Sequence, residues 1–226
     1  MCSESVAAIR VLVVDNDPLA ISTIKRYLSC ENDISIIDEA QDGFDALDKL
    51  KQKAVDIVLA AIRMPAMSGV SLLQEMRLRN IPANFIAMTA LDSDNTMIEV
   101  LTGGGSGYLV KSSTPRELVT AIRSVAAGGV AVSPKPLSRL VSYISDKQPQ
   151  PKNASPVAST YENLNAMEKK VLDNLCCGKS NADIARTLQY SEATVKKYIS
   201  SLIAQFHASS RLDLAILVIE SGVITK

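Results

Sequence analysis

The N-terminal part of the chain, up to Gly128, alternates short apolar runs with longer amphipathic segments. The apolar runs cover residues 9–14, 34–37, 57–62, 84–88 and 107–110. Short runs that are apolar almost throughout are typical of strands buried on both faces of a sheet. The segments between them repeat apolar residues with the period of an amphipathic helix, as at 71–77 and 118–125. This alternation predicts an α/β fold, with a doubly wound, five-stranded parallel sheet and helices on both of its faces.

The pattern changes after Gly128. Residues 134–145 place their apolar side chains on one face after two prolines, which predicts a single helix. Residues 146–160 are polar, contain three prolines and have almost nothing to bury, which predicts a semi-extended linker. The chain therefore divides into a first domain, a connecting helix with its linker, and a second domain, at 1–128, 129–160 and 161–226.

The second domain carries the start and stop signals of four short helices. A capping residue stands three positions ahead of an acid at Asn165, Ser180 and Ser210, as in capping boxes. Gly178 and Gly222 stand where helices commonly end. Four short, closely spaced helices predict a compact all-α domain.

Residues 181–189 and 192–206 have the proportions of a helix-turn-helix. The second of these helices repeats apolar residues at Val195, Ile199, Leu202 and Phe206. Its opposite side carries Lys196, Lys197, Ser200, Ser201 and Gln205. Such side chains can bond phosphates and base edges from the major groove. A merely solvated face is the alternative, because residues 161–226 hold eight basic and seven acidic residues and lack a strongly basic footprint.

Composition narrows the class of protein. The 226 residues suffice for two ordinary domains, and 24 Lys and Arg balance 24 Asp and Glu, so no overall charge draws the chain to nucleic acid or to an acidic membrane. Four cysteines without C-x-x-C spacing, together with the lack of a signal-like start, favour reduced thiols in the cytoplasm. No apolar stretch approaches the ~20 residues needed to cross a bilayer. We find no nucleophile, base and orienting group in one place, so we expect no enzyme.

Polar residues recur at the ends of the predicted strands. Asp15, Thr89 and Lys111 follow or end three of the apolar runs, and Ala61 lies at the end of another. Taken singly, Thr89 fits a turn cap and Lys111 fits a solvated loop residue. The crevice outside the carboxyl ends of parallel strands is, however, where binding sites form. Their recurrence at successive strand ends favours a single functional site.

Four stretches of the second domain carry a resemblance to a known module: LNAMEKKVL at 164–172, GKSNADIA at 178–185, SEATVKKYI at 191–199 and RLDLA at 211–215. They resemble the DNA-binding module of LuxR/NarL-type transcription regulators. The resemblance implies a homodimer on double-stranded DNA, with DNA-facing residues Lys179, Thr194, Lys196, Lys197, Ser200 and Ser201. It implies a dimerisation helix that includes Leu212, Ala215, Ile216 and Ile219. The sequence departs from the family at His207, where glycine is usual, and at Tyr198, where histidine or asparagine is common.

The first domain carries the ordered stretches VLVVDNDP at 11–18, RMP at 63–65, SG at 68–69, MTA at 88–90 and GYLVK at 107–111. They are similar to the motifs of two-component receiver domains, so the whole chain resembles a NarL-family response regulator with a flavodoxin-like receiver. In that family a strand-end aspartate accepts a phosphoryl group from a sensor histidine kinase. That aspartate and two acids near the first strand hold Mg²⁺, and a threonine and a lysine bind the phosphoryl oxygens.

The acidic site of that family is incomplete in this chain. Asp15 matches the first acid, but Asn16 replaces the second and Ala61 replaces the phosphoacceptor. Asp17 is the remaining acid of the acidic pocket, and its side chain can turn away. Mg²⁺ prefers octahedral oxygen ligands with at least one or two carboxylates. We therefore expect no cofactor, or Mg²⁺ held only weakly at Asp15.

The switch residues of the family are retained, since Thr89, Tyr108 and Lys111 match them. Without the further carboxylates, Lys111 is free to pair with Asp15. We predict that this ion pair locks the site without phosphate.

Two origins of Ala61 fit the sequence. The chain is either a natural regulator without a phosphoacceptor, which Asn16 favours, or a phosphorylation-dead Asp-to-Ala form of an ordinary response regulator. In both cases we expect a transcription regulator that binds inverted-repeat DNA as a dimer. One alternative is a ligand-responsive regulator in which a metabolite occupies the acidic pocket or the groove near the linker. Another is an interaction protein that dimerises with a phosphorylatable partner.

Overall fold

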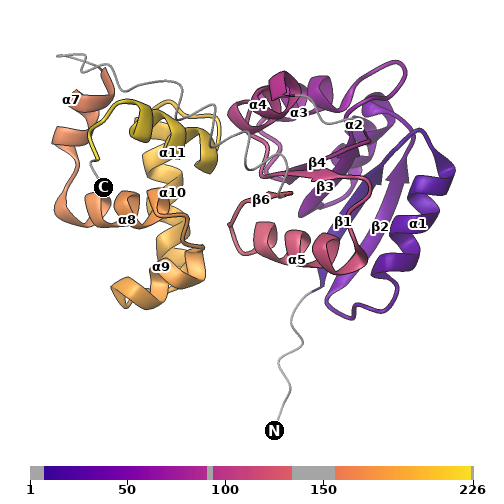
Figure 1. Ribbon diagram of the computed structural model, residues 1–226, viewed down its shortest axis with the longest axis horizontal. Coiled ribbons are helices and arrows are strands. Elements are labelled where there is room, and N and C mark those ends of the chain that lie inside the picture. Colours follow the sequence, from indigo (N-terminus) through magenta and orange to yellow (C-terminus); the bar gives the residue numbers. More distant parts are fainter. Residues whose placement is uncertain (1–7, 91–93, 134–155, 225–226) are drawn as a thin grey trace, which may run out of the picture.

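The structure is a computed structural model that describes residues 8–90, 94–133 and 156–224, and it shows two domains (Figure 1). In the N-terminal domain the described strands are β1 (Ile9–Val14), β2 (Ile34–Ala40), β3 (Ile57–Ala61), β4 (Asn84–Thr89), β5 (Gly107–Val110) and β6 (Ala131–Val132). They form one sheet in the order β2-β1-β3-β4-β5-β6, with parallel pairing throughout. Its described helices are α1 (Pro18–Leu28), α2 (Gly43–Gln52), α3 (Gly69–Leu78), α4 (Asp94–Thr102) and α5 (Pro115–Ala126).

The sequence predicted five strands, and the sixth strand is a correction. Ala131 pairs with Gly107, and Val132 pairs with Tyr108, so the sheet continues beyond the predicted domain end at residue 128. A strand of two residues is too short to leave a periodic signal in the sequence. It forms because the edge of β5 offers backbone groups that require hydrogen-bond partners.

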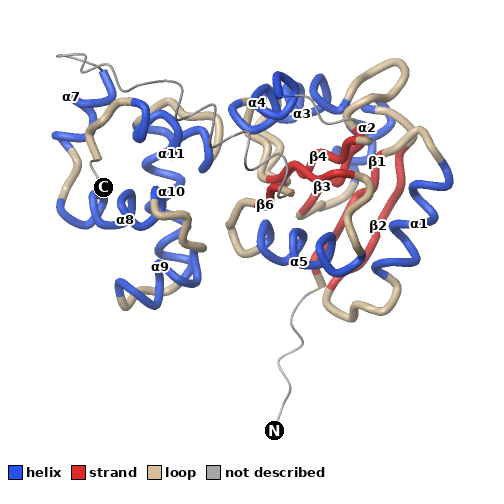
Figure 2. Tube along the Cα trace, viewed as in Figure 1, coloured by secondary structure: helices blue, strands red, loops and turns tan. Residues whose placement is uncertain are grey.

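Helices cover both faces of the sheet, as predicted, with α1 and α5 on one face and α2, α3 and α4 on the other (Figure 2). Successive residues of a strand point to opposite faces. Val11 and Val13 accordingly pack in the layer of α1 and α5, whereas Leu12 and Val14 pack in the opposite layer. All four side chains are fully buried, which accounts for the unbroken apolar character of this run.

The C-terminal domain consists of described helices α7 (Pro156–Asn163), α8 (Ala166–Cys176), α9 (Asn181–Leu188), α10 (Glu192–Gln205) and α11 (Arg211–Glu220). The four predicted helices correspond to α8 through α11. Helix α7 is a correction, because residues 156–160 were assigned to the linker. Val157 and Tyr161 lie one helical turn apart and pack against the domain core, a short signal hidden in a polar context. The predicted helix at 134–145 and the rest of the linker lie outside the described residues.

The ends of these helices follow the predicted capping chemistry. Asn165 and Ser180 form complete capping boxes with Glu168 and Asp183. Gly178 has a φ of 77°, the left-handed conformation that favours glycine. His207 also adopts this conformation, at φ 52°, which accounts for the glycine usual there in LuxR-type modules. The departure at His207 therefore strains the backbone without changing the fold.

The two domains contact each other mainly through α4 and α11 (Figure 1). Ile216 of α11 belongs to the same buried apolar cluster as Met97 and Leu101 of α4, and Leu212 packs against that cluster. The hydroxyl of Ser210 donates a hydrogen bond to the carbonyl of Leu101 at 3.3 Å. The C-terminal domain thus completes part of the apolar core of the N-terminal domain.

Candidate functional site

The predicted ion pair between Lys111 and Asp15 is present at the carboxyl edge of the sheet. Lys111 Nζ lies 2.5 Å from Asp15 Oδ2, and the Asp15 side chain is 2% exposed. The end of β1 places the carboxylate, and the turn after β5 brings the ammonium group over it. Because an unpaired buried carboxylate is costly, Lys111 supplies the compensating charge.

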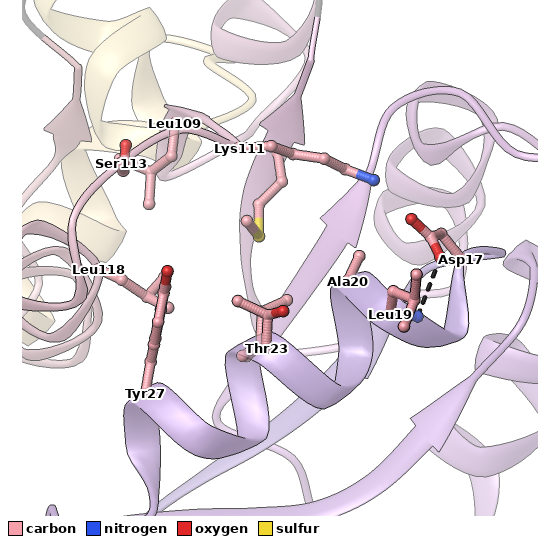
Figure 3. A pocket seen from close by; sticks show the side chains of 11 residues that line it. Asp17, Leu19, Ala20, Thr23, Tyr27, Leu109, Lys111, Ser113 and Leu118 are labelled. Carbon is pink, nitrogen blue, oxygen red and sulfur yellow. Dashed lines mark hydrogen bonds between the residues drawn. The ribbon is translucent and has the colours of Figure 1, made fainter.

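Asp17 caps a helix and does not take part in this ion pair. Its Oδ1 accepts a hydrogen bond from the amide of Leu19 at 2.9 Å, which caps the start of α1 (Figure 3). Its own amide donates to Asp15 Oδ1 at 3.0 Å. Asn16, between the two acids, is exposed. The loop therefore presents one buried carboxylate and one capping carboxylate.

Ala61 and Thr89 end the two central strands of the site. Ala61 is 2% exposed, and its methyl group offers no nucleophile. The N-terminus of α3 packs tightly on its backbone, since a Cβ at Gly69 would lie 2.3 Å from the Ala61 carbonyl oxygen. Thr89 is buried as well, and its carbonyl accepts a hydrogen bond from the Lys111 amide at 2.6 Å. Tyr108, the third predicted switch residue, is fully buried in β5.

The carboxylates at this site fit Mg²⁺ poorly. Asp15 is engaged by Lys111, Asp17 is committed to the cap, and Asn16 and Ala61 add no charge. Within the described ranges, no group of three His, Cys, Asp or Glu side chains is arranged to hold a metal ion. A divalent cation would have to displace the ammonium group of Lys111 and would gain a single buried carboxylate.

A cavity of about 260 Å³ lies beside Lys111, between α1 and α5. Figure 3 shows Lys111 and Asp17 at one end of this cavity, with Tyr27 and Leu118 toward the other. Thr23 adds a hydroxyl group to a largely apolar lining. This cavity adjoins the lysine of the ion pair, whereas a second cavity, of about 450 Å³, is lined by Asp15 and Asn16.

The helix-turn-helix is formed by α9 and α10. Val195, Ile199, Leu202 and Phe206 are buried in the domain core, as predicted. Lys196, Lys197, Ser200 and Ser201 are exposed on the opposite side of α10. The arrangement matches a recognition helix, with one apolar face held by the domain and one polar face available for DNA.

Other predicted DNA-facing residues are engaged within the domain. Lys179 Nζ donates to Asn174 Oδ1 at 2.7 Å. The Thr194 hydroxyl lies 2.9 Å from that of Ser191, whose side chain caps α10. Tyr198, which was not among the predicted DNA-facing residues but departs from the family pattern, packs beside Tyr190, with ring centroids 6.3 Å apart.

Part of the polar face of α10 borders the N-terminal domain. Lys196 and Ser200 line a cavity of about 290 Å³ whose other wall includes Asn84, Gly104 and Ser106. This arrangement places part of the polar face of α10 at the boundary between the two domains.

The predicted dimerisation residues lie on α11 and are divided between several environments. Leu212 and Ile216 pack on the N-terminal domain, and Ala215 is buried in the core of its own domain. Ile219 is 36% exposed. Part of the predicted dimer face is thus already covered within one chain.

Sequence reasoning missed the close approach of the domains at two glycines. Gly104 has a φ of 101°, and a Cβ there would lie 2.9 Å from the Ser209 carbonyl oxygen. Gly128 has a φ of 78°, and a Cβ there would lie 2.1 Å from Asn181 Nδ2. The glycine-rich run at 103–107 is visible in the sequence, but it is typical of a turn between helix and strand and does not indicate a contact between domains.

Two family models match the chain. Residues 11–123 match the response regulator receiver domain, and residues 162–218 match the bacterial regulatory proteins of the luxR family. None of the described helices combines the length and the apolar character that a membrane crossing requires.

Similar proteins cover nearly the whole chain. It is 32% identical over 203 residues to a probable transcriptional regulatory protein NarL of Mycobacterium tuberculosis, covering 90% of each chain. It is 30% identical over 211 residues to the nitrate/nitrite response regulator protein NarP of Escherichia coli, covering 93% of this chain and 94% of the relative.

Solved structures show the same fold. The response regulator ChrA of a heme-sensing two-component system is 26% identical and gives a TM-score of 0.52, covering 94% of this chain and 96% of that one. The receiver domain of the putative response regulator NarL from Mycobacterium tuberculosis is 32% identical, with a TM-score of 0.53 and coverage of 54% of this chain and 98% of that one.

Proposed function

This chain belongs to the two-component response regulators with a LuxR-type DNA-binding domain and is a transcription regulator, and we propose that it works without phosphorylation of its receiver. The observation that carries the proposal is the ion pair of Lys111 with Asp15 beside Ala61. An alanine side chain has no oxygen that could attack a phosphoryl donor. The lysine that would bind the phosphoryl oxygens is already neutralised by a buried carboxylate.

DNA remains the target of the output domain in this proposal. The polar face of α10 carries ammonium groups, which can contact phosphates, and hydroxyl groups, which can contact phosphates or bases. We infer binding to an inverted repeat as a homodimer, with half-sites about one helical turn apart. A cytoplasmic location follows from this target. A sensor histidine kinase is a partner only in the alternative in which Ala61 replaces a native aspartate.

The arrangement of the domains supports a closed, DNA-inactive state. Lys196 and Ser200 line the cavity between the domains, while Leu212 and Ile216 pack on the N-terminal domain. Separation of the domains would expose the recognition helix and part of α11 together. Both surfaces needed for dimeric DNA binding would then become available in one step.

Phosphotransfer from acetyl phosphate tests the first part of the proposal. We expect the wild-type chain to remain unmodified on a phosphate-affinity gel. The variant Ala61→Asp should form an acid-stable, base-labile acyl phosphate slowly, and the double variant Asn16→Asp/Ala61→Asp should form it faster because it regains a metal-binding carboxylate. Phosphorylation of the wild-type chain would refute the proposal.

Fluorescence anisotropy with inverted-repeat DNA tests the second part. Lys197→Ala should weaken binding and lower the slope of log K against log salt by about 1 if the side chain contacts a phosphate. Lys170→Ala is the matched control, because Lys170 is an exposed lysine that belongs to α8 and not to the recognition helix. Equal effects of the two variants, or no preference over competitor DNA, would count against the proposed interface.

A further inference from the structure

Three positively charged side chains line the cavity of about 290 Å³ between the domains. Arg77 comes from α3, Lys196 from α10, and Arg211 from the start of α11. Among the described residues that line this cavity there is no carboxylate. Three cations from two domains therefore line one cavity without a lining counter-ion among the described residues.

Arg77 carries the clearest sign of a binding site, because one of its buried donors has no acceptor among the described residues. Its Nη2 donates to the carbonyl of Gly104 at 2.9 Å, but its buried Nε has no hydrogen-bond partner in the described part of the chain. Burial lowers the pKa of this guanidinium group, and no acid offsets the effect. Burying a cationic donor in this way is unfavourable unless an acceptor completes it.

Among the described residues, the acceptors that hold Arg211 are neutral. Its Nη1 donates to Asn181 Oδ1 at 2.7 Å, and its Nη2 donates to the carbonyl of Lys179. Burial lowers the pKa of Arg211 to about 10. These bonds fix the direction of the guanidinium group while leaving its charge uncompensated.

Asp56 interacts electrostatically with Lys196 but does not line the cavity. Asp56 is already engaged, because Arg10 donates to both of its carboxylate oxygens at 2.8 Å and 3.0 Å. The ammonium group of Lys196 is therefore only partly balanced.

We propose that this cavity binds a compact, multiply charged phosphate anion that bridges the two domains. Guanidinium groups present a planar fork of donors that matches phosphate oxygens, and Lys196 adds a point charge. A single carboxylate would leave most of the positive charge unpaired. The volume lies at the lower end of the ~300–1,000 Å³ typical of ligand cavities, which suits pyrophosphate or a small phosphate ester better than a dinucleotide.

Such an anion stabilises the closed state, because its partners come from α3 on one domain and from α10 and α11 on the other. It also occupies Lys196 and Ser200, which we assign to DNA. The anion and DNA therefore compete. This inference rests on the closed state of the proposed function, and it adds a ligand that holds that state.

Isothermal titration calorimetry of the full chain with pyrophosphate, at constant ionic strength, tests the proposal. We expect saturable one-to-one binding that weakens at least tenfold in Arg77→Gln. Arg79→Gln is the matched control, because it removes the same charge at the C-terminal end of α3. The guanidinium group of Arg79 is exposed and pairs with Glu75 at 2.7 Å. Inorganic phosphate and citrate, added in parallel, separate recognition of a diphosphate from recognition of a single phosphate or of any polyanion.

A lack of saturable binding, equal loss in both variants, or equally tight binding of citrate would overturn the proposal. If Arg77→Gln unfolds, Lys196→Gln decides, since its exposed side chain can be changed without disturbing the core. Pyrophosphate should also weaken DNA binding by the wild-type chain and by Arg79→Gln, with a smaller effect on Arg77→Gln. Failure to bind DNA even without pyrophosphate would count against the proposed function, while calorimetry would still decide the anion site.

Discussion

Replacement of Gly128 by alanine is expected to open the two domains. Gly128 ends α5 with a φ of 78°, and the added Cβ would lie 2.1 Å from Asn181 Nδ2 and 2.7 Å from Asn181 Cγ. Real Cβ atoms essentially never approach another heavy atom closer than 3.0 Å. Asn181 cannot simply rotate away, because it is 7% exposed and its Oδ1 accepts a hydrogen bond from Arg211 at 2.7 Å.

The size of the effect follows from the two consequences of the methyl group. Overpacking a tight contact costs about 1–3 kcal/mol, and this cost falls on the closed state alone. The ratio of closed to open protein should then fall by about 5- to 150-fold. While the closed state dominates, affinity for DNA should rise by the same factor. The left-handed backbone adds about 1–2 kcal/mol of strain to open and closed states alike, so it lowers unfolding stability without shifting this equilibrium.

Gly178→Ala separates these two consequences. Gly178 ends α8 with a φ of 77°, and no described atom lies within 4 Å of a Cβ built there. In urea both variants should lose the stability that the left-handed strain costs. Gly128→Ala should lose in addition the cost of the contact with Asn181, up to the free energy by which the closed state is favoured over the open one. In fluorescence anisotropy with inverted-repeat DNA, only Gly128→Ala should bind more tightly than the wild-type chain. Wild-type affinity in Gly128→Ala, or an equal gain in Gly178→Ala, would refute the argument that this contact holds the domains closed.

The other predictions concern ionisable groups. Lys111→Met should lower the free energy of unfolding by up to about 3 kcal/mol, because it leaves the carboxylate of Asp15 buried without a counter-ion. Adding Asp15→Asn to that variant should restore part of the loss. Urea unfolding at neutral pH measures both effects. Iodoacetamide should label the exposed Cys30 and spare Cys176 below about pH 10, because burial raises the pKa of the Cys176 thiol to about 12. Mass spectrometry of the native chain measures the labelling, and prompt labelling of Cys176 would contradict its burial. The hydrogen bonds from Arg10 lower the pKa of Asp56. The pair of Arg10 with Asp56 should therefore stabilise the fold above about pH 4, and this stabilisation should be lost as the pH falls through the lowered pKa of Asp56. Asp56→Asn should remove that part of the acid dependence in urea titrations between about pH 2 and pH 5, and an unchanged dependence would show that other carboxylates carry it.

Local patterns in the sequence were sufficient for most of the secondary structure. The five longer strands and helices α8 through α11 repeat their apolar residues over one strand or one helix, so each signal lies within a short stretch. The caps at Asn165 and Ser180 are equally local, since each joins residues three positions apart. The ion pair of Lys111 with Asp15 was predictable despite its long separation, because parallel strands bring their carboxyl ends to one edge of the sheet.

The sequence by itself also determined that residue 61 is an alanine, and the proposal that the receiver works without phosphorylation depends on that one side chain and not on packing. Only the tertiary structure decided how the output domain meets the receiver. Arg77, Lys196 and Arg211 lie far apart in the chain and share no periodicity, so nothing local indicates that they line one cavity. The same holds for β6 and for Gly128 against Asn181. Contacts of this kind depend on the surfaces that two folded domains present to each other, and those surfaces exist only after each domain has formed.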